Sequence, residues 1–427
     1  MTLGTAFATE TPVFPKADPQ KVDLGRLLFY DKILSGNKNI ACATCHHPAL
    51  GTSDKLSLGV GEGGRGLGPH RTTGTGRDRI NRRVPRNAPG LWNLGASQIN
   101  VLMHDGRISA DPLYGNGFNT PAEEWLPQGL DTVLAAQALF PVTSETEMAG
   151  HHEENEVAGA VNDRIDRAWP ILAKRVRSIP AYGEGFVAAF PHIDSPEQVS
   201  IVEIANAIGA FIAEEFQSLD SAYDAYLAGD ATALSPAQHR GRDLFFGKAA
   251  CAGCHAGPLF SDHQFRALGL PAFGPGRTRR FDPMARDVGR MGESDAAADA
   301  YRFRTPMLRN VALTAPYGHN GAYPTLGAMI RHHLDPEAAR ATWSPEMVTL
   351  PSADWLQPVD FVIQSDRLEM ARQARARDIY LKPKLTEGEI ADLVAFLESL
   401  TGAEAAAVAY EIPSEVPSGL PVDTLSQ

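Results

Sequence analysis

Two Cys-x-x-Cys-His strings constrain the fold of this chain more than any other feature. They contain every cysteine of the 427 residues. In such a string both thiols can bond to the vinyl groups of one haem, and the adjacent histidine is then held under the iron as its proximal ligand. A thioredoxin-like redox pair, a four-cysteine zinc site and two disulfides are the alternatives. The duplication favours two haem c groups, attached at Cys42, Cys45 and His46 and at Cys251, Cys254 and His255.

Length and charge narrow the class further. A chain of 427 residues is too long for one haem-binding module and suits two domains. Its 39 Lys and Arg against 51 Asp and Glu give a net charge of -12, which argues against nucleic acid as a partner. No apolar run approaches the roughly 20 residues of a membrane span. Covalent haem attachment takes place outside the cytoplasm, so we expect an exported, periplasmic protein, although this chain shows no complete signal peptide.

The sequence around the two strings repeats. Residues 25–30, Gly-Arg-Leu-Leu-Phe-Tyr, precede the first string, and residues 241–246, Gly-Arg-Asp-Leu-Phe-Phe, precede the second. Each segment predicts a short amphipathic helix that leads to a haem. A closing helix also recurs, with Glu203 near the start of the first copy and Glu389 near the start of the second. Thr386 and Glu389 have the spacing of a capping box.

These repeats predict an all-α fold made of two cytochrome c-like domains, each with one covalently attached haem c, plus long loops. We expect an N-terminal domain over residues 1–218 and a C-terminal domain over residues 219–402. The boundary is expected near residues 218–234, where the segment 220–234 is small and polar. The tail, residues 403–427, is rich in Ala, Pro and Ser and is expected to be extended or disordered.

Five further strings, together with the first haem string, resemble the bacterial dihaem cytochrome c peroxidase and MauG family over nearly the whole chain. The resemblance implies that the N-terminal haem is the site of hydrogen peroxide and that the C-terminal haem is a six-coordinate electron relay. The matching strings are Leu34-Ser35-Gly36, Arg86-Asn87-Ala88-Pro89, His104-Asp105-Gly106-Arg107, residues 137–148 and Thr305-Pro306-Met307-Leu308-Arg309-Asn310.

A register of three residues marks the peroxide pocket in the resembling family: a glutamine, a proline four residues later and a glutamate six beyond that. Gln137, Pro141 and Glu147 match it. Breaking the bond of a bound peroxide requires a base that takes a proton from one oxygen and returns it to the departing one. We expect Glu147 to have that role, although a glutamate in Thr-Glu-Met taken alone is more often a surface carboxylate.

The chain departs from the family pattern in the loop that caps the peroxide haem. Members that need reductive activation have a histidine in a Gly-His-Gly loop, whereas residues 59–61 here are Gly-Val-Gly. Because Val60 cannot bind iron, the resemblance implies an open, five-coordinate first haem, as in MauG. His47 and His70 are nearby histidines that remain alternative ligands.

The distal ligand of the second haem is also unusual. In the family it is a methionine or a tyrosine seven residues after a leucine, and counting from Leu326 leads to His333. His332 remains an alternative, because adjacent helical residues point about 100° apart and only one can face the haem. Met307 and Met329 are expected in the core. A second imidazole lowers the haem potential and favours the storage of oxidising equivalents.

Two features between the haems complete the expected site. The family usually has a tryptophan before Asp-Gly-Arg, and this chain has His104, a candidate polar bridge between the haem edges; Trp92 is a possible replacement for the missing indole. The resemblance also implies a calcium ion bound by Asn87 and by backbone carbonyls near Arg304 and Pro306, since calcium prefers oxygen ligands.

Three functions fit these observations. The first is a MauG-like or MbnH-like enzyme that uses hydrogen peroxide to form a high-valent dihaem state and oxidises a side chain, such as tryptophan, on a partner protein. The second is a cytochrome c peroxidase that reduces hydrogen peroxide to water with electrons from a small cytochrome or cupredoxin. The third is a non-enzymatic electron-transfer protein, against which the Gln137 and Glu147 pair argues. The segment 110–132 and the pair His151 and His152 have no assigned role.

Overall fold

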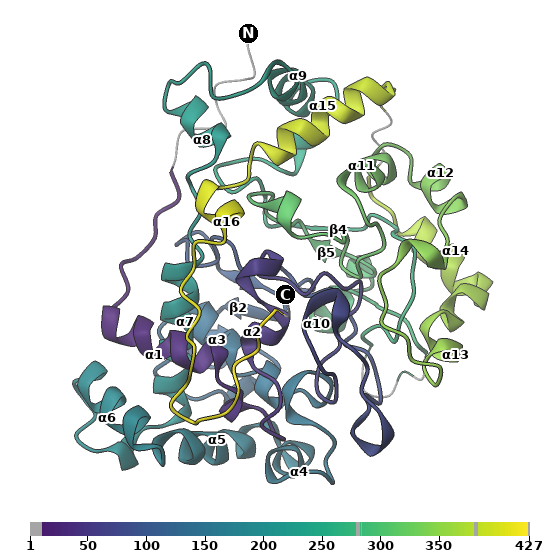
Figure 1. Cartoon of the computed structure of the whole chain (residues 1–427). Coiled ribbons are helices and arrows are strands. Elements are labelled where there is room, and N and C mark those ends of the chain that lie inside the picture. Colours follow the sequence, from purple (N-terminus) through teal and green to yellow (C-terminus); the bar gives the residue numbers. More distant parts are fainter. Residues whose placement is uncertain (1–10, 279–281, 283, 380–382, 426–427) are drawn as a thin grey trace.

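Helices joined by long loops dominate the computed structural model, which describes residues 11–278, 282, 284–379 and 383–425 (Figure 1). The described part of the chain is helix-rich, as expected. None of its helices is long and apolar enough to cross a membrane. The helices are α1 (Pro19–Tyr30), α2 (Cys42–Cys45), α3 (Val133–Ala138), α4 (Glu156–Asp163), α5 (Ala168–Arg177), α6 (Pro180–Ala189), α7 (Ile201–Glu215), α8 (Ala222–Leu227), α9 (Pro236–Phe246), α10 (Met291–Ser294), α11 (Leu326–Leu334), α12 (Pro336–Ala341), α13 (Gln357–Asp360), α14 (Arg367–Arg375), α15 (Glu387–Glu398) and α16 (Ala403–Ala407).

Two small antiparallel sheets accompany the helices and were not expected from the sequence. The first joins β1 (Val101–Leu102), β2 (Ile108–Ala110) and β3 (Phe118–Asn119) in that order. The second pairs β4 (Phe265–Arg266) with β5 (Phe303–Arg304). Their strands have only two or three residues. The sheets therefore hold loops in place, and the fold remains helix-rich.

The repeated helices pack as two equivalent pairs, α1 with α7 and α9 with α15 (Figure 1). Each pair crosses at the glycine of the repeated string. A Cβ atom on Gly25 would lie 2.0 Å from the Ala207 carbonyl oxygen, and one on Gly241 would lie 1.9 Å from that of Asp392. The predicted helices are confirmed, and the predicted capping box of Thr386 is formed in α15. Glycine is required because only a hydrogen fits between the backbones.

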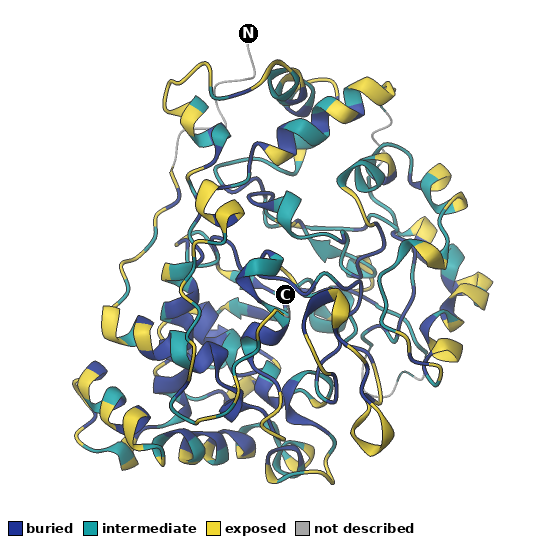
Figure 2. Cartoon of the chain, in the orientation of Figure 1, coloured by how far each residue is buried: buried dark blue, intermediate teal, exposed yellow. Residues whose placement is uncertain are grey.

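Buried residues form one large cluster, mainly N-terminal, and smaller clusters, two of which combine residues from both halves of the chain. Figure 2 shows the largest concentration of buried residues around α1, α3, α5 and α7. A second cluster contains Tyr223, Phe245 and Phe396 and lies between α8, α9 and α15. The polar segment 220–234 forms α8, and Tyr223 of this helix is 5% exposed. The burial of one aromatic side chain outweighs the polar composition around it.

The C-terminal tail begins as a helix and continues as an extended strap. The sequence missed α16, whose Ala405 is buried against the large cluster. Beyond it, residues 408–425, which we call the strap, run over α7 and α1 and end near α2 (Figure 1). Ser418 donates to Asp31 at 2.6 Å, and the Lys32 ammonium lies 2.6 Å from the Asp423 carboxylate. Beyond α16 the described tail is extended, and these contacts hold it on the N-terminal half.

Candidate active site

The first haem string lies on the short helix α2, which brings its two thiols to one side. Cys42 and Cys45 are three residues apart, the spacing at which helical side chains are neighbours. His46 follows, and its Nδ1–H donates to the Thr52 carbonyl at 3.0 Å. This bond fixes the tautomer in which Nε2 has a free lone pair, as in most metal-binding histidines. The imidazole is therefore oriented to bind iron.

The second string has the same arrangement. Residues 251–253 form a single 3-10 turn, and the Nδ1–H of His255 donates to the Phe260 carbonyl at 3.1 Å. Burial lowers the pKa of His255 to about 4, so its imidazole is neutral at physiological pH. A neutral imidazole is the form that binds a metal.

His333, on α11, lies opposite His255. The two ring centroids are 6.4 Å apart, and the Nδ1–H of His333 donates to the Met329 carbonyl at 2.9 Å. A metal binds an imidazole nitrogen at about 2 Å, and the ring centre lies about 1 Å farther, so two axial imidazoles on one iron have centroids roughly 6 Å apart. The spacing therefore fits an iron between His255 and His333.

His332 has no ring nitrogen left for a metal. The Tyr323 hydroxyl donates to its Nδ1 at 2.9 Å, and its Nε2–H donates to the Leu268 carbonyl at 3.0 Å. Its side chain is fully buried. The two adjacent histidines thus differ in chemistry: His332 is a structural side chain, and His333 retains a free Nε2.

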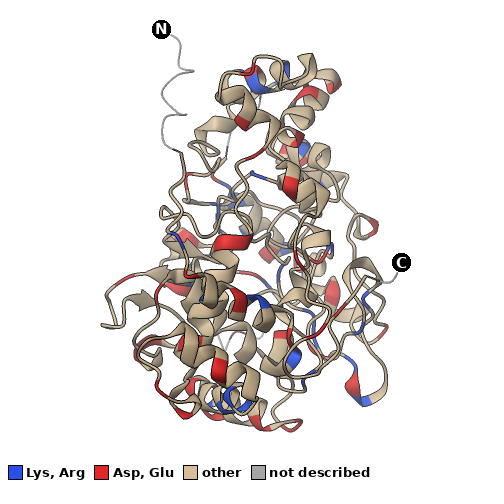
Figure 3. Cartoon of the chain, turned by 60° about the vertical axis from the view of Figure 1, so that its left-hand side comes forward, with Lys and Arg blue, Asp and Glu red and all other residues tan. Residues whose placement is uncertain are grey.

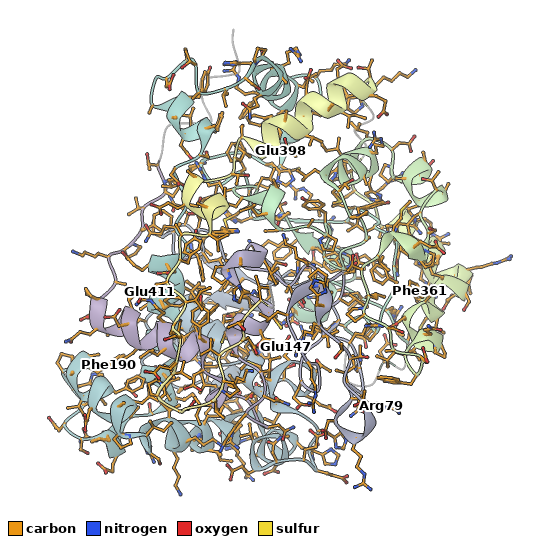
Figure 4. The ribbon with its side chains drawn as sticks, in the orientation of Figure 1. Arg79, Glu147, Phe190, Phe361, Glu398 and Glu411 are labelled. Atoms are coloured by element: carbon orange, nitrogen blue, oxygen red, sulfur yellow. The ribbon has the colours of Figure 1, made fainter. Side chains whose placement is uncertain are left out.

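Glu147 is half-buried and lies close to the first string (Figure 4). It belongs to a five-residue π-helix, Glu145–Ala149, and such turns are frequent at functional sites. The loop 59–61 packs directly on this turn, since a Cβ atom on Gly61 would lie 2.8 Å from the Cα of Glu147. Val60 is fully buried, and Arg71 donates to the carbonyls of Val60 and Gly61. The loop 59–61, where a Gly-His-Gly loop would have its histidine, here forms a wall beside Glu147 that these hydrogen bonds hold in place.

The environment of Glu147 favours a protonated carboxyl group. Burial raises its pKa, and the more distant charges of Arg107 and Arg277 act in the opposite direction. A buried carboxyl group whose pKa is raised holds a proton more readily than an exposed one, which suits general acid–base chemistry. Glu145, on the same turn, is exposed.

Gln137 and Pro141 lie on the turns that precede Glu147. The amide nitrogen of Gln137, near the end of α3, is 4.0 Å from the Met103 sulfur. Pro141 begins the 3-10 turn 141–143, which packs against the π-helix of Glu147. The structure thus places the three residues of the predicted register on consecutive turns of one segment.

His104 is half-buried and already hydrogen-bonded. Its Nε2–H donates to the Asn87 carbonyl at 3.1 Å, and its own carbonyl accepts from the Arg304 backbone N–H at 2.7 Å. Burial, with a smaller effect of the nearby Arg86, lowers its pKa to about 4. His104 is therefore neutral and ties the loop before Asp105 to the segment around Arg304.

Asp54 is a buried acid that the sequence analysis missed. Its Oδ1 accepts from the Leu56 backbone N–H at 2.9 Å, and its Oδ2 is buried without a partner. Burial raises its pKa to about 7. Asp54 lies in the sequence between the first string and the 59–61 loop, which could have indicated a role near the haem. An aspartate in Thr-Ser-Asp is, however, typical of a turn.

A buried arginine cluster near His104 has too few carboxylates. Asp105 accepts hydrogen bonds from Arg86, Arg107 and Arg277, which hold its pKa well below the usual range although burial acts to raise it. Arg304 has no carboxylate partner among the described residues, its Nη1 is buried and unpaired, and burial lowers its pKa to about 10. An unpaired buried guanidinium requires an anion. The two propionates of a haem would supply it, so the residues present fit haem.

The residues proposed for calcium are brought together only in part. The Asn87 side chain donates its Nδ2–H to the Leu56 carbonyl at 2.7 Å, which leaves its amide oxygen for another partner. His255 lies close to the Pro306 carbonyl. The described residues contain no group of three or more His, Cys, Asp and Glu side chains that could hold a metal ion, and this includes the segment around His151 and His152.

A helix-rich chain with two Cys-x-x-Cys-His strings, each with its histidine oriented by a backbone carbonyl, defines a c-type haem oxidoreductase. The family model for di-haem cytochrome c peroxidase, the MauG family, matches residues 19–232, and the chain belongs to this family. It is a haem-dependent oxidoreductase of the peroxidase family, which uses hydrogen peroxide.

MauG proteins and cytochrome c peroxidases match this chain with similar identity. The chain is 28% identical over 410 residues to the methylamine utilization protein MauG of Methylorubrum extorquens, covering 95% of this chain and 85% of the relative. It is 29% identical over 337 residues to the cytochrome c551 peroxidase of Nitrosomonas europaea, covering 76% and 79%. A crystal structure of a MauG-like protein associated with microbial copper homeostasis superposes with a TM-score of 0.62 at 26% identity, covering 97% and 99%.

Proposed function

We propose that this protein uses hydrogen peroxide to oxidise a side chain, such as tryptophan, on a partner protein, as a MauG-like or MbnH-like enzyme. The observation that carries the proposal is the 6.4 Å spacing of the His255 and His333 rings. A second haem with two imidazole ligands holds oxidised iron more readily than one with a methionine ligand. A haem with this ligation would share oxidising equivalents with the peroxide site, whereas a simple relay would only pass electrons from a donor to that site.

The proposal assigns a haem c to each string. His46 would hold the peroxide haem, and His255 and His333 would together hold the second haem. The first haem supplies the iron at which peroxide is bound and reduced. Val60, in the wall beside Glu147, offers no ligand that would block that iron, and Arg71 holds this wall in place.

The protein's own residues manage the proton. The ionised form of Glu147 would accept a proton from hydrogen peroxide and return it to the departing oxygen, which leaves as water. Because burial raises the pKa of this carboxyl group, its carboxylate is a stronger base than an exposed one. Gln137 and Pro141 shape the same pocket from the preceding turns, and Arg304 with its neighbours binds haem propionates.

The proposal also includes a division into two cytochrome c-like domains, residues 1–218 and 219–402, each around one haem. A calcium ion between the haems, held by the Asn87 oxygen and by the carbonyls of Arg304 and Pro306, is part of it. A periplasmic location follows from covalent haem attachment. The proposed partner is a protein. In Figure 3 the acidic and basic residues are interspersed along the ribbon.

One experiment tests the axial ligand and a second tests the reaction. The resting oxidised protein should show one high-spin and one low-spin ferric signal in its electron paramagnetic resonance spectrum. His333→Ala should convert the low-spin signal to high-spin, whereas the adjacent control His332→Gln should keep a low-spin second haem. A low-spin signal that survives in His333→Ala contradicts the ligand assignment.

The reaction is tested by adding hydrogen peroxide to the fully oxidised protein without a reductant. A long-lived change in the absorption spectrum of both haems is the expected result. A cytochrome c peroxidase that needs prior half-reduction would show no change until one electron is added. A protein that fails to react in either state would be an electron-transfer protein, and the proposed function would be wrong.

A further inference from the structure

A short hydrogen-bonded connection leads from the first proximal histidine to a buried indole. The imidazole of His46 donates to the Thr52 carbonyl at 3.0 Å, and Trp92 donates its Nε1–H to the neighbouring Gly51 carbonyl at 3.1 Å. Only the Gly51-Thr52 segment separates the two hydrogen bonds. Trp92 is 4% exposed, so it is shielded from water, and it bonds to the segment that orients His46.

A tyrosine of the strap continues this connection toward the surface. The ring centroids of Trp92 and Tyr410 are 5.9 Å apart, and Phe216 packs against both rings at 5.9 and 5.8 Å. Tyr410 is half-buried, whereas its neighbours Ala409 and Glu411 are exposed. Figure 4 shows Glu411 on the strap at the side of the molecule. The three rings thus connect a buried indole to the strap.

Both ends of this aromatic contact are held firmly. The Asn93 side chain accepts from the Ser218 backbone N–H at 2.8 Å and donates to the Ser218 carbonyl at 3.1 Å, next to Trp92 and Phe216. Arg26 of α1 binds the Glu411 carboxylate at 3.3 Å, next to Tyr410. Fixed ring contacts at this distance favour electron transfer, because the coupling between two groups falls steeply with their separation.

Tryptophan and tyrosine are among the side chains that lose one electron most easily, and phenylalanine is not. We propose that Trp92 and Tyr410 form a path by which oxidising equivalents leave the first haem and reach the strap, where an external one-electron donor is oxidised at Tyr410. This inference rests on the proposed function only for its oxidant, hydrogen peroxide.

The electrons and protons of this path balance as follows. Trp92 gives one electron to the peroxide-oxidised first haem, and Tyr410 then gives one electron to the oxidised indole. The Tyr410 hydroxyl has no hydrogen-bond partner among the described residues, and the negative charges of Asp220, Glu404 and Glu215 act on it. Its proton moves to one of these carboxylates as the electron leaves. When the neutral tyrosyl radical takes one electron from the external donor, the same proton returns from the carboxylate, which restores both groups.

The test uses the full-length, haem-loaded protein with ring-deuterated tyrosine. Hydrogen peroxide is added without a reductant, the sample is frozen, and a tyrosyl radical is sought by electron paramagnetic resonance, where deuteration narrows its signal. Tyr410→Phe should lose the signal, and so should Trp92→Phe. Tyr30→Phe is the matched control, because Tyr30 lies in the same aromatic cluster with an equally unpaired hydroxyl but contacts Phe29 and Phe211 instead of Trp92.

A peroxy acid in place of hydrogen peroxide separates this inference from the proposed function. A peroxy acid releases a carboxylate, which is a better leaving group than hydroxide. It therefore oxidises ferric haem without the proton transfer assigned to Glu147. A radical on Tyr410 formed with the peroxy acid but not with hydrogen peroxide would support the path and contradict the proposed function. A radical that persists in Tyr410→Phe, disappears equally in Tyr30→Phe, or fails to form with either oxidant would overturn the path.

Discussion

At the scale of single residues, Glu147 is the side chain whose environment most directly supports peroxide chemistry. Glu147→Gln should lower the rate of the reaction with hydrogen peroxide by about 10² or more, because the amide cannot accept and return a proton. Stopped-flow absorption of the haems measures this rate. Glu145→Gln, on the same π-helix but exposed, should react at the wild-type rate. Equal rates for wild type and Glu147→Gln would remove this carboxyl from the mechanism.

Asp54 gives a second prediction, on pH dependence. Burial raises the pKa of Asp54 to about 7, whereas the pKa of an aspartate in the unfolded chain is about 3.9. Between these values the unfolded chain loses the proton and the folded chain keeps it, so folding stability falls as the pH rises from about 4 to about 7, by at most about 4 kcal/mol. Asp54→Asn should remove that decline, measured as the melting temperature at a series of pH values. The exposed control Asp78→Asn should retain it.

Sequence alone leads to the haem strings, to the Gln137, Pro141 and Glu147 register and to His333 as a candidate ligand, because each depends on a fixed spacing. Arg304 could not be found in the same way. Its significance lies in the absence of a carboxylate partner in a buried position, which is a property of distant segments meeting. The sequence also could not separate His332 from His333, since the partners Tyr323 and Leu268 decide that question.

At the scale of elements, the helix pairs are predictable because their signals are local. Capping boxes and the repeated glycine strings mark the starts and crossings of α7, α9 and α15. The helices α8 and α16 were missed, since small and polar residues are compatible with both a helix and a linker. Only packing decides between them, here the burial of Tyr223 and of Ala405.

The crossing of α9 and α15 yields a prediction at this scale. Gly241→Ala should destabilise the protein by several kcal/mol, because the added Cβ would lie 1.9 Å from the Asp392 carbonyl oxygen and the backbones cannot separate without breaking other contacts. Gly388→Ala, in α15 with its nearest neighbour 3.9 Å away, should instead stabilise slightly, by up to about 1 kcal/mol. Chemical denaturation measures both. Similar free energies of unfolding for the two variants would contradict the crossing.

At the scale of the whole molecule, buried ion pairs join the N-terminal and C-terminal halves. Arg83 donates to both oxygens of Asp360 at 2.9 and 3.0 Å, and the two side chains are only 2% and 4% exposed. Arg86 pairs with Asp287 in the same manner, at 2.7 and 2.8 Å. Because these pairs connect segments far apart in the sequence, the two halves should unfold together.

Removing one partner tests this coupling. Asp360→Ala should lower the free energy of unfolding by about 3–5 kcal/mol, since it leaves the Arg83 guanidinium buried without its carboxylate. The double variant Arg83→Met with Asp360→Leu should recover most of that loss, because replacing both charges by apolar groups removes the desolvation cost. Asp78→Ala, which breaks the exposed pair with Arg65, should change stability by less than about 1 kcal/mol. If Asp360→Ala leaves a single transition at the wild-type midpoint of denaturation, the buried pair does not couple the halves, and their cooperation has to come from the haems and the strap.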